Sequence, residues 1–600
     1  MNTKKFICLF MTLLLVVLCG CEGYTPAITM DTIPESTGGK DIEPALGEDN
    51  VFSLNSNSNY SFNPLIATNH SNQLVCCLVY ENMLEIDENF NVIKNVIIDW
   101  KHNDDCTYWE FELDTSHTFH DGTPVTGADL RYSLERAVSA QQRYRGRFSS
   151  FQGASYEENK LYVTLGIGDS QLYRLMDIPI IKNGTYPDDY PMGSGPYMYS
   201  DDYAEPVLDE NGEPVPDKVR YTALVPYEGY VGLPIFPEES DEEENTGPKF
   251  THNDVKHPVD IIYLKEYTDA QSTLTAFEDS LIDVVINDPS SYTNIGYAST
   301  NEIHTYPTTN MHFVVFNEQS VLGKYSNFRY AMNFAFDRNN LVTLLHGNGI
   351  ASAIPMYPSC DIYPDDLNRN FQYNLEMCKT VLENAGVKDY DEDGRLEYMS
   401  GVPQEIELIF VVCSDSSAKT GVVRRFAEDM DSIGLKVTVK ELSWADYMTA
   451  LEEGNFDMYY GEVKLRGNFD MTELLQVRPK LKEGQTTTNL NYSGSTDEGY
   501  MTYIGSYLKS SESDRIYNYA MLADYITQNA MFITIGFEKQ QIILHRGILK
   551  GVDPNYGNPL FDFVNWEFIN KFDPAPPLPE KPKTEDVILD IDGEKAVSEA

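Results

Sequence analysis

TYWEFELDTSHTFHDGTPVTGADLRYSLERA, residues 107–137, combines a strand, two turns and the start of a helix. Apolar and polar residues alternate over Tyr108–Leu113, which predicts a strand, and polar turn residues follow it. Thr126 precedes Asp129 by the spacing of a capping box, in which each side chain satisfies a free donor at the start of a helix. Apolar residues then recur at helical spacing from Leu130 onward. The stretch is therefore predicted to form a strand–turn–helix unit.

Length and charge limit the class of protein. The chain has 600 residues, which is too long for one core, so two or three domains are expected. The formal charge of −49 excludes general nucleic-acid binding, because phosphates would be repelled. It favours a protein that stays soluble outside the cell.

The N-terminal segment is typical of a signal peptide. Two lysines precede an apolar run, Phe6–Leu18, which is too short for a typical membrane-spanning helix. The run ends in LCGC at positions 18–21, which resembles the lipobox of bacterial lipoproteins. The resemblance implies that residues 1–20 are removed and that Cys21 carries a lipid anchoring the chain to the outer side of the cell membrane. An ordinary secretory signal is the alternative.

The two ends of the remaining chain differ in composition from its middle. Residues 21–50 are rich in Gly, Pro, Thr and acids and are predicted to be a flexible tether. Residues 573–600 begin with a proline-rich, acidic stretch and are predicted to be a disordered tail. Residues 201–256 are expected to be an insertion. Its acidic run, Glu238–Glu244, is predicted to be a solvated loop, with cation capture as the alternative.

Two motifs could suggest a metal site, but neither is a strong signal for one. His117, His120 and Asp121 form HxxHD, but on a strand and turn they need not converge, so they are predicted to be structural. The DxDxDG run at 389–394 starts like a calcium loop, yet its twelfth position is Ser400 instead of glutamate. A polar turn is predicted there, with weak calcium binding as the alternative.

The sequence contains no HExxH, GxSxG, P-loop or strand-to-helix GxGxxG motif, so we expect neither an enzyme nor a cofactor. Six cysteines follow Cys21, and none has zinc-site spacing. They are predicted to be buried apolar residues, with one disulfide as the alternative in an exported protein. These cysteines are Cys76, Cys77, Cys106, Cys360, Cys378 and Cys413.

Strands and helices alternate in the second half of the chain, which predicts a sheet with helices on its faces. The predicted strands are 406–413, 435–442 and 456–461, and the helices between them are 417–433 and 444–451. Further strands are predicted at 313–316 and 542–549.

Four blocks, taken in order, resemble the bacterial extracellular solute-binding proteins of family 5, the peptide- and nickel-type receptors of ABC importers. The blocks are VYENML at 79–84 with IDW at 98–100 and the unit quoted above, GSGPY at 193–197, FN at 316–317 with FRYAMNFAFDRNNLV at 328–342, and AGVKDYDEDGR at 385–395 with IGLKV at 433–437.

The resemblance implies an α/β, two-lobed, periplasmic-binding-protein-like fold of type II, in the large family-5 form with an extra domain and a hinge between the lobes. Lobe one would comprise residues 51–83, 193–310 and 540–572, the extra domain 84–192, and lobe two 311–539. The chain would cross between lobes near 310–316 and again near 539–544.

The resemblance also implies a function. The protein would capture oligopeptides by lobe closure and deliver them to the membrane subunits of an ABC permease, acting as a monomer. The alternative within the family is another solute, namely a chelated metal, a sugar or an anionic small molecule. A surface hydrolase or adhesin is disfavoured, because neither nucleophile and metal motifs nor repeats are present.

One position departs from the peptide-binding pattern. Peptide-binding members commonly place an aspartate, which pairs with the ligand's ammonium, where this chain has Arg466 or Gly467. Arg466 favours a carboxylate or phosphate instead, and Asp470 takes the amine only if the loop is rearranged. A solvated loop charge is the alternative role for Arg466.

Other ligand contacts are expected in three places. The backbone of the strand that contains Val412 and Cys413 can pair with a peptide, and Trp444 would cover the ligand or belong to the core. The third place is the loop at 56–65, with Asn57, Asn59 and Tyr60.

Overall fold

The computed structural model describes residues 51–144, 146–209, 211–237, 250–287, 300–345, 349–480 and 487–569. The predicted signal peptide, Cys21, the tether, the acidic run at 238–244 and the tail lie outside these residues. Among the helices that are described, none has both the length and the apolar character needed to cross a membrane.

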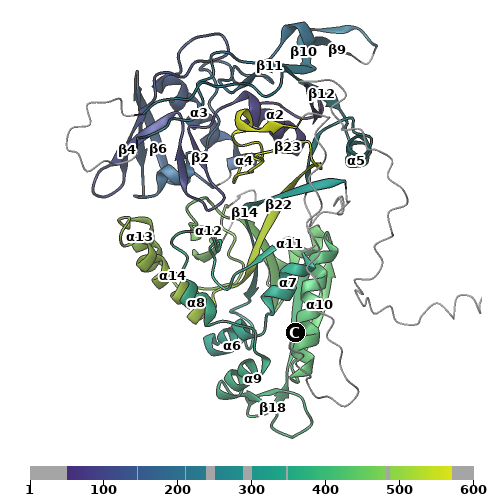
Figure 1. Cartoon of the computed structure of the whole chain (residues 1–600). Helices are drawn as coiled ribbons and strands as arrows, with labels where there is room; N and C mark the ends of the chain where they lie inside the picture. Colours follow the sequence, from purple (N-terminus) through teal and green to yellow (C-terminus); the bar gives the residue numbers. More distant parts are fainter. Residues whose placement is uncertain are drawn as a thin grey trace, which may run out of the picture. The chain divides into compact units, whose positions relative to one another are not determined.

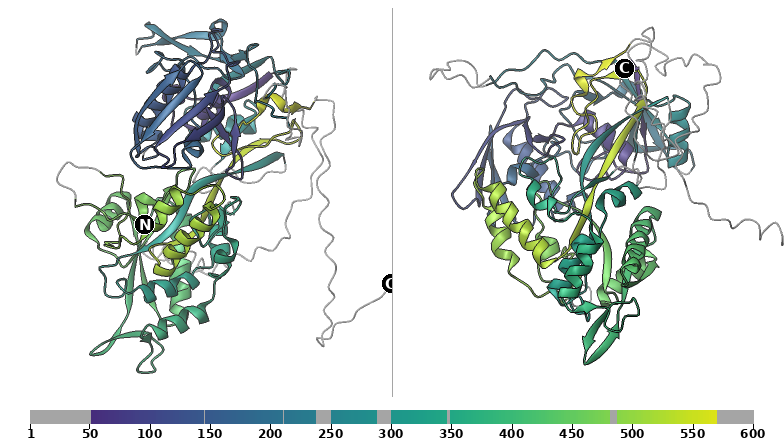
Figure 2. Two further views of the ribbon diagram at one scale, coloured as in Figure 1. Left: turned by 90° about the vertical axis from the view of Figure 1, so that its left-hand side faces the viewer. Right: turned by 60° about the horizontal axis from the view of Figure 1, so that its bottom comes forward.

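Two long antiparallel strands, β14 (Asn301–Phe316) and β22 (Ile533–His545), lie side by side near the middle of the largest sheet (Figure 1). Figure 2 shows this teal and yellow pair from two further sides. The strand order is β13-β22-β14-β21-β19-β20, and β15 also pairs with β22. The added strands are β13 (Val284–Asn287), β15 (Gly349–Ala351), β19 (Glu407–Cys413), β20 (Lys436–Leu442) and β21 (Met458–Lys464).

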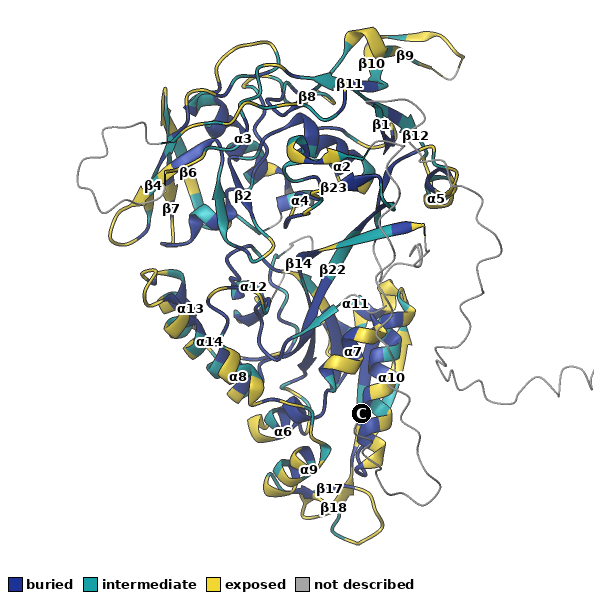
Figure 3. Ribbon diagram, viewed as in Figure 1, coloured by how far each residue is buried: buried dark blue, intermediate teal, exposed yellow. Residues whose placement is uncertain are grey.

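The predicted alternation of strands and helices in the second half is confirmed. Strand β19 pairs in parallel with both β20 and β21, and the connections contain α10 (Ser417–Ser432) and α11 (Trp444–Glu453). Figure 3 shows α10 with one buried and one exposed face. On the buried face, Phe426 contacts Phe410 of β19 edge to face at 5.5 Å, a favourable geometry for aromatic pairs.

Further helices surround this sheet. Their first turns follow capping rules: Asp337 and Asn374 accept backbone N–H groups at the starts of α7 and α9. These helices are α6 (Ser326–Ala331), α7 (Arg338–Leu344), α8 (Asp365–Arg369), α9 (Leu375–Asn384), α12 (Thr472–Leu475), α13 (Tyr500–Leu508) and α14 (Arg515–Asn529). The three-stranded sheet β16 (Val387–Lys388), β17 (Glu397–Ser400) and β18 (Val402–Glu405) follows α9.

Two four-stranded sheets belong to the first part of the chain. One has the order β1-β12-β11-β8 and the other the order β4-β5-β7-β6. Their strands are β1 (Val51–Ser56), β4 (Ile97–His102), β5 (Tyr108–Leu113), β6 (Phe151–Glu157), β7 (Lys160–Leu165), β8 (Tyr197–Tyr199), β11 (Ala223–Pro226) and β12 (Ile261–Glu266). Two-stranded pairs are β2 (Leu84–Ile86) with β3 (Val92–Lys94), β9 (Ala204–Leu208) with β10 (Pro214–Tyr221), and β23 (Leu549–Lys550) with β24 (Glu567–Phe568). The helices here are α2 (His70–Val79), α3 (Gly127–Ser139), α4 (Gln141–Tyr144) and α5 (Ala270–Glu278).

The stretch at 107–137 forms the predicted unit of β5, turns and α3. The carboxylate of Asp129 accepts the Thr126 backbone N–H at 3.0 Å and the Thr126 hydroxyl at 2.6 Å. Gly127 is required at the helix start, because a Cβ there would lie 2.2 Å from the carbonyl oxygen of Glu157 in the β6–β7 turn. The helix start therefore packs directly on the neighbouring sheet.

Candidate functional site

A cavity of about 490 Å³ lies between segments that are far apart in the sequence. One side comes from α2, α4, the middle of β14 and residues 556–559. The other side comes mainly from the end of β21 and the loop that follows it, residues 462–467. By the predicted boundaries, the first group belongs to lobe one and the extra domain, and the second to lobe two.

Four basic side chains line this cavity: Arg143, Arg147, Lys464 and Arg466. Arg143 lies in α4 and donates from Nη1 to the carbonyl oxygen of Ala67 at 3.3 Å. Lys464 is the last residue of β21, and its side chain is exposed to the cavity. In a chain with a formal charge of −49, this concentration of cations is unexpected.

The acidic side chains of the cavity already have basic partners. Asp177 forms an ion pair with Arg147. Glu473 lies 3.1 Å from Nη2 of Arg466, and Glu462 lies 2.7 Å from Nζ of Lys419.

Arg143 and Lys464, in contrast, have no acidic partner within the part of the chain that the structure describes. The cavity therefore carries two cations whose charge is not neutralised by the protein.

The pKa of Lys464 reflects the positive charge of the cavity. The walls of the cavity desolvate its ammonium, and the charges of Arg143 and Arg147 add repulsion, so the pKa of Lys464 falls to about 8. A bound anion would relieve both effects. The arrangement is suited to a carboxylate or another small anion, since such a ligand would accept charge-assisted hydrogen bonds there.

Of the residues predicted as ligand contacts, Arg466 lines the cavity. Its guanidinium is mostly buried and bridges the carboxylates of Asp470 and Glu473, so it is not a solvated loop charge. Asp470 is itself buried beneath that contact and also accepts the Thr472 backbone N–H at 2.9 Å. Its carboxylate is thus committed to Arg466 and to the local turn.

The other predicted contacts lie elsewhere in the described chain. Asn57 is buried and donates to the carbonyl oxygen of Thr268 at 3.2 Å. Val412 and Cys413 are buried within β19. Asn59 and Tyr60 are exposed in the loop after β1, and Trp444 is 64% exposed at the start of α11, so the alternative of a core role for Trp444 is wrong.

Sequence motifs did not single out Arg143, Arg147 and Lys464. A signal was present, because RYRGR at 143–147 is a basic run in a strongly acidic chain, and Lys464 precedes Arg466 by two positions. The two runs meet only because β21 and α4 reach the same cavity, which local patterns do not reveal.

Two residues of the polar motifs make contacts expected of structural turns. Nε2 of His120 lies 3.1 Å from the carbonyl oxygen of Gly195, and burial lowers the pKa of His120 to about 4. Asp389 accepts the backbone N–H of Gly394 at 2.9 Å, as expected for a polar turn. All six described cysteines are free thiols, so the alternative of a disulfide among them is wrong.

Comparison with known proteins identifies the family. The model "Bacterial extracellular solute-binding proteins, family 5 Middle" matches residues 91–473. The oligopeptide-binding protein AppA of Bacillus subtilis is 21% identical over 418 residues, which cover 66% of this chain and 69% of AppA.

Solved structures show the same fold. AppA of Bacillus subtilis in complex with a nonapeptide superimposes with a TM-score of 0.55 at 17% identity, covering 87% of this chain and 99% of that one. NikA of Brucella suis in complex with Fe(III)-EDTA gives a TM-score of 0.60 at 14% identity, covering 87% and 100%. The predicted two-lobed α/β fold class is thereby confirmed. The chain belongs to the bacterial extracellular solute-binding proteins of family 5, and it is a substrate-binding protein of an ABC importer, not an enzyme.

Proposed function

We propose that this protein captures short oligopeptides and presents them to its permease, with the ligand's terminal carboxylate held by Arg143 and Lys464. The observation that carries the proposal is that these two cations face the cavity without an acidic partner among the described residues. A volume of about 490 Å³ is within the range of sites for small ligands and suits a short peptide. The oligopeptide-binding name of the relative AppA supports the peptide class.

The experiment compares peptides with and without a terminal charge. Thermal-shift and calorimetric titrations would use tripeptides with a free C-terminus and the same tripeptides as C-terminal amides. We expect stabilisation by the free acids and binding about 10- to 100-fold weaker for the amides, the loss expected for a charge-assisted hydrogen bond. Equal binding of acid and amide would overturn the role of the two cations. Absence of any peptide binding, together with binding of another solute, would overturn the peptide class.

Two variants test whether Lys464 and Arg143 hold the peptide carboxylate. Lys464→Met and Arg143→Met should weaken free-acid peptides and leave the amides almost unchanged. Lys440→Met is a matched control, because Lys440 is exposed on β20 and does not line the cavity.

A non-peptide anion is the second candidate. Every acid lining the cavity within the described residues is already paired, so none is free to receive a peptide ammonium. The NikA complex contains Fe(III)-EDTA, a polycarboxylate chelate. A protein of the same fold therefore binds a ligand of this class. Chelated metals, acidic sugars and small dicarboxylates therefore belong in the same screen.

We infer that the lobes close about β14 and β22. The pairing of these strands shifts register between Pro307 and Met311, opposite Phe537–Lys539. Residues within the shift line the cavity, namely Thr308 and Asn310. A local irregularity in a strand pair suits a hinge, since few backbone hydrogen bonds must rearrange there.

We also propose that Cys21 carries the lipid anchor, on the strength of LCGC at 18–21 after an apolar run. In a bacterial expression host, the wild-type chain should partition into the membrane fraction and Cys21→Ser into the soluble fraction. Equal partition of both would contradict the proposal.

A further inference from the structure

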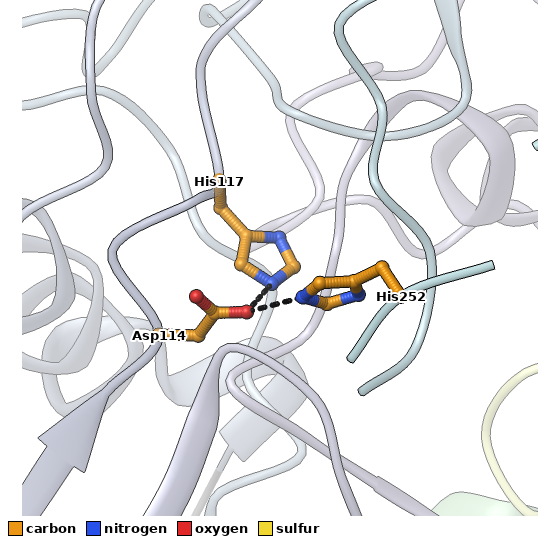
Figure 4. Close-up of side chains that lie close together, drawn as sticks. All are labelled: Asp114, His117 and His252. Carbon is orange, nitrogen blue, oxygen red and sulfur yellow. Dashed lines mark hydrogen bonds and ion pairs between the residues drawn. The ribbon is translucent and has the colours of Figure 1, made fainter. Parts of the chain in front are cut away.

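Two histidines and one aspartate converge away from the ligand cavity (Figure 4). Asp114 follows β5 directly, His117 lies in the turn after it, and His252 comes from a segment 135 positions later. Oδ2 of Asp114 lies 3.3 Å from Nε2 of His117 and 2.7 Å from Nε2 of His252. All three ligand atoms lie within 4.8 Å of one another. From the sequence His117 is predicted to be structural, because it need not converge with His120 and no third well-spaced ligand lies near it in the chain.

The ring of His117 is held in one orientation from behind. Its Nδ1 lies 3.0 Å from Oε1 of Glu81, and its side chain is 1% exposed. If Nδ1–H donates to Glu81, the neutral ring directs the lone pair of Nε2 toward Asp114. Among the described residues Nε2 has no hydrogen-bond partner, although it is buried. A carboxylate behind a histidine is the usual support of a metal-ligating imidazole.

Asp114 is oriented in the same way. Its Oδ1 accepts the backbone N–H of Ser116 at 2.9 Å and the Ser116 hydroxyl at 2.8 Å. Oδ2 is thereby left to face the two histidines. Nε2 of His117 and Nε2 of His252 both lie close to this oxygen, so the two rings direct their Nε2 atoms at Asp114.

Charge gives a second reason for a cation at this point. Glu81 and Asp114 place two carboxylates in a buried environment, which is costly unless positive charge is supplied. Protons are the competing occupants, because an imidazolium at His117 would face the same two carboxylates. A divalent ion would supply the same charge and use the unbonded Nε2.

We propose that Asp114, His117 and His252 form a structural Zn²⁺ site, with Glu81 as the positioning residue for His117. Imidazole nitrogen and carboxylate oxygen are the ligands of zinc at about 2.0–2.1 Å, and a tetrahedral ion keeps its ligands about 3.3 Å apart. The distance from Nε2 of His117 to Oδ2 of Asp114, 3.3 Å, equals that value. The distance from Nε2 of His252 to the same oxygen, 2.7 Å, is that of a hydrogen bond and would lengthen around an ion. The fourth position is open to water or to the hydroxyl of Ser116, which lies 3.3 Å from Nε2 of His252.

An ion at this site would link the turn after β5 to the segment that contains His252. Thr251, next to His252, forms an isolated bridge with Ile235, so little regular structure holds this segment in place. An ion shared with the turn after β5 would bind it to the sheet β4-β5-β7-β6. The three ligands are absent from the lining of the ligand cavity, so this proposal is independent of the solute that the protein carries.

The test is calorimetric titration of EDTA-treated full chain with zinc chloride, accompanied by thermal unfolding with and without zinc. Wild type is expected to bind one Zn²⁺ and to gain thermal stability. His252→Ala should lose this binding. The His252 side chain is partly exposed, so we expect this variant to fold. Glu81→Gln should bind zinc about 10- to 100-fold more weakly, the usual loss for a supporting carboxylate. His102→Ala, an exposed histidine elsewhere on β4, is the matched control and should behave as wild type.

Two results would overturn the site. If wild type binds no zinc, protons and not a metal ion balance the carboxylates of this cluster. If His252→Ala and Asp114→Asn retain wild-type zinc binding, with circular dichroism showing that both are folded, the ion binds elsewhere.

Discussion

Lys464 makes the binding of an anion depend on pH. Its pKa is about 8 in the folded protein, compared with about 10.4 for an unperturbed lysine. The ammonium is present below pH 8 and is lost as the pH rises through that value, so affinity for a carboxylate ligand should fall. Calorimetry at about pH 7 and about pH 9 should show a decrease of up to tenfold per pH unit. In Lys464→Met this decrease should be absent; a wild-type profile in that variant would assign the titration to another group.

The same residue has the opposite effect on stability. Between pH 8 and about 10.4 the unfolded chain binds more protons at Lys464 than the folded chain does. The contribution of Lys464 to the free energy of unfolding therefore rises with pH over this window, because the folded state is relieved of a desolvated charge. Ligand affinity and this part of the stability should thus change in opposite directions.

Arg466 is predicted to matter for folding as well as for the ligand. It bridges Asp470 and Glu473 with all three side chains mostly buried, so Arg466→Ala removes the basic partner of two carboxylates. We expect a loss of about 3 kcal/mol in the free energy of unfolding, measured by urea denaturation. The sequence-based expectation is that this variant also loses an anionic ligand and leaves an ammonium-directed ligand nearly unaffected.

The control for this prediction is Arg466→Ala combined with Asp470→Asn and Glu473→Gln. If the loss comes from uncompensated charge, the triple variant should recover much of it. A triple variant less stable than the single one would assign the effect to packing of the arginine stem instead.

At the scale of an element, the start of α3 depends on Asp129 more than on Thr126. The Asp129 carboxylate accepts the backbone N–H groups of Thr126 at 3.0 Å and of Asn183 at 2.9 Å. Asp129→Ala should therefore lower the free energy of unfolding by about 1–2 kcal/mol, and Thr126→Ala by about 0.5–1 kcal/mol. Urea denaturation of both variants tests the order, which would be reversed if the Thr126 hydroxyl were the main cap.

Local patterns predicted elements whose signals lie within a few residues. The capping box at Thr126 and the alternation around β19–α10–β20 are of this kind, and the structure has both. The strand predicted at 313–316 is instead the end of β14, Asn301–Phe316. Its first half contains Pro307 and polar residues, which no alternation marks as a strand, and it is ordered by pairing with β22.

The candidate site was harder to predict for the same reason. Arg466 came from a family position, whereas Arg143 and Lys464 meet across 321 residues of sequence through tertiary folding alone. The zinc ligands His117 and His252 are likewise distant. Spacing rules detect ligands within one loop or helix, and they have no access to such pairs.

At the scale of the whole molecule, the two strands β14 and β22 are expected to couple ligand binding to lobe closure. Glu538 of β22 connects them beside the register shift: its carboxylate lies 2.9 Å from Nε2 of His312 and accepts from Nδ2 of Asn310 at 3.1 Å. Its backbone carbonyl accepts the Thr308 hydroxyl at 2.8 Å. Glu538 is absent from the cavity lining, whereas its partners Thr308 and Asn310 belong to it, so we expect a change at Glu538 to act through the proposed hinge.

Small-angle X-ray scattering with and without saturating ligand measures this coupling. We expect the radius of gyration of wild type to decrease on binding, because a ligand that contacts both lobes favours the closed form. Glu538→Ala removes the side-chain links at the hinge and should change affinity several-fold while the thermal-shift preference between free-acid and amide peptides stays as in wild type. Lys464→Met should do the reverse, losing that preference while retaining the compaction at higher ligand concentration. An unchanged radius in ligand-saturated wild type would exclude closure about these strands, whatever the affinity of the cavity.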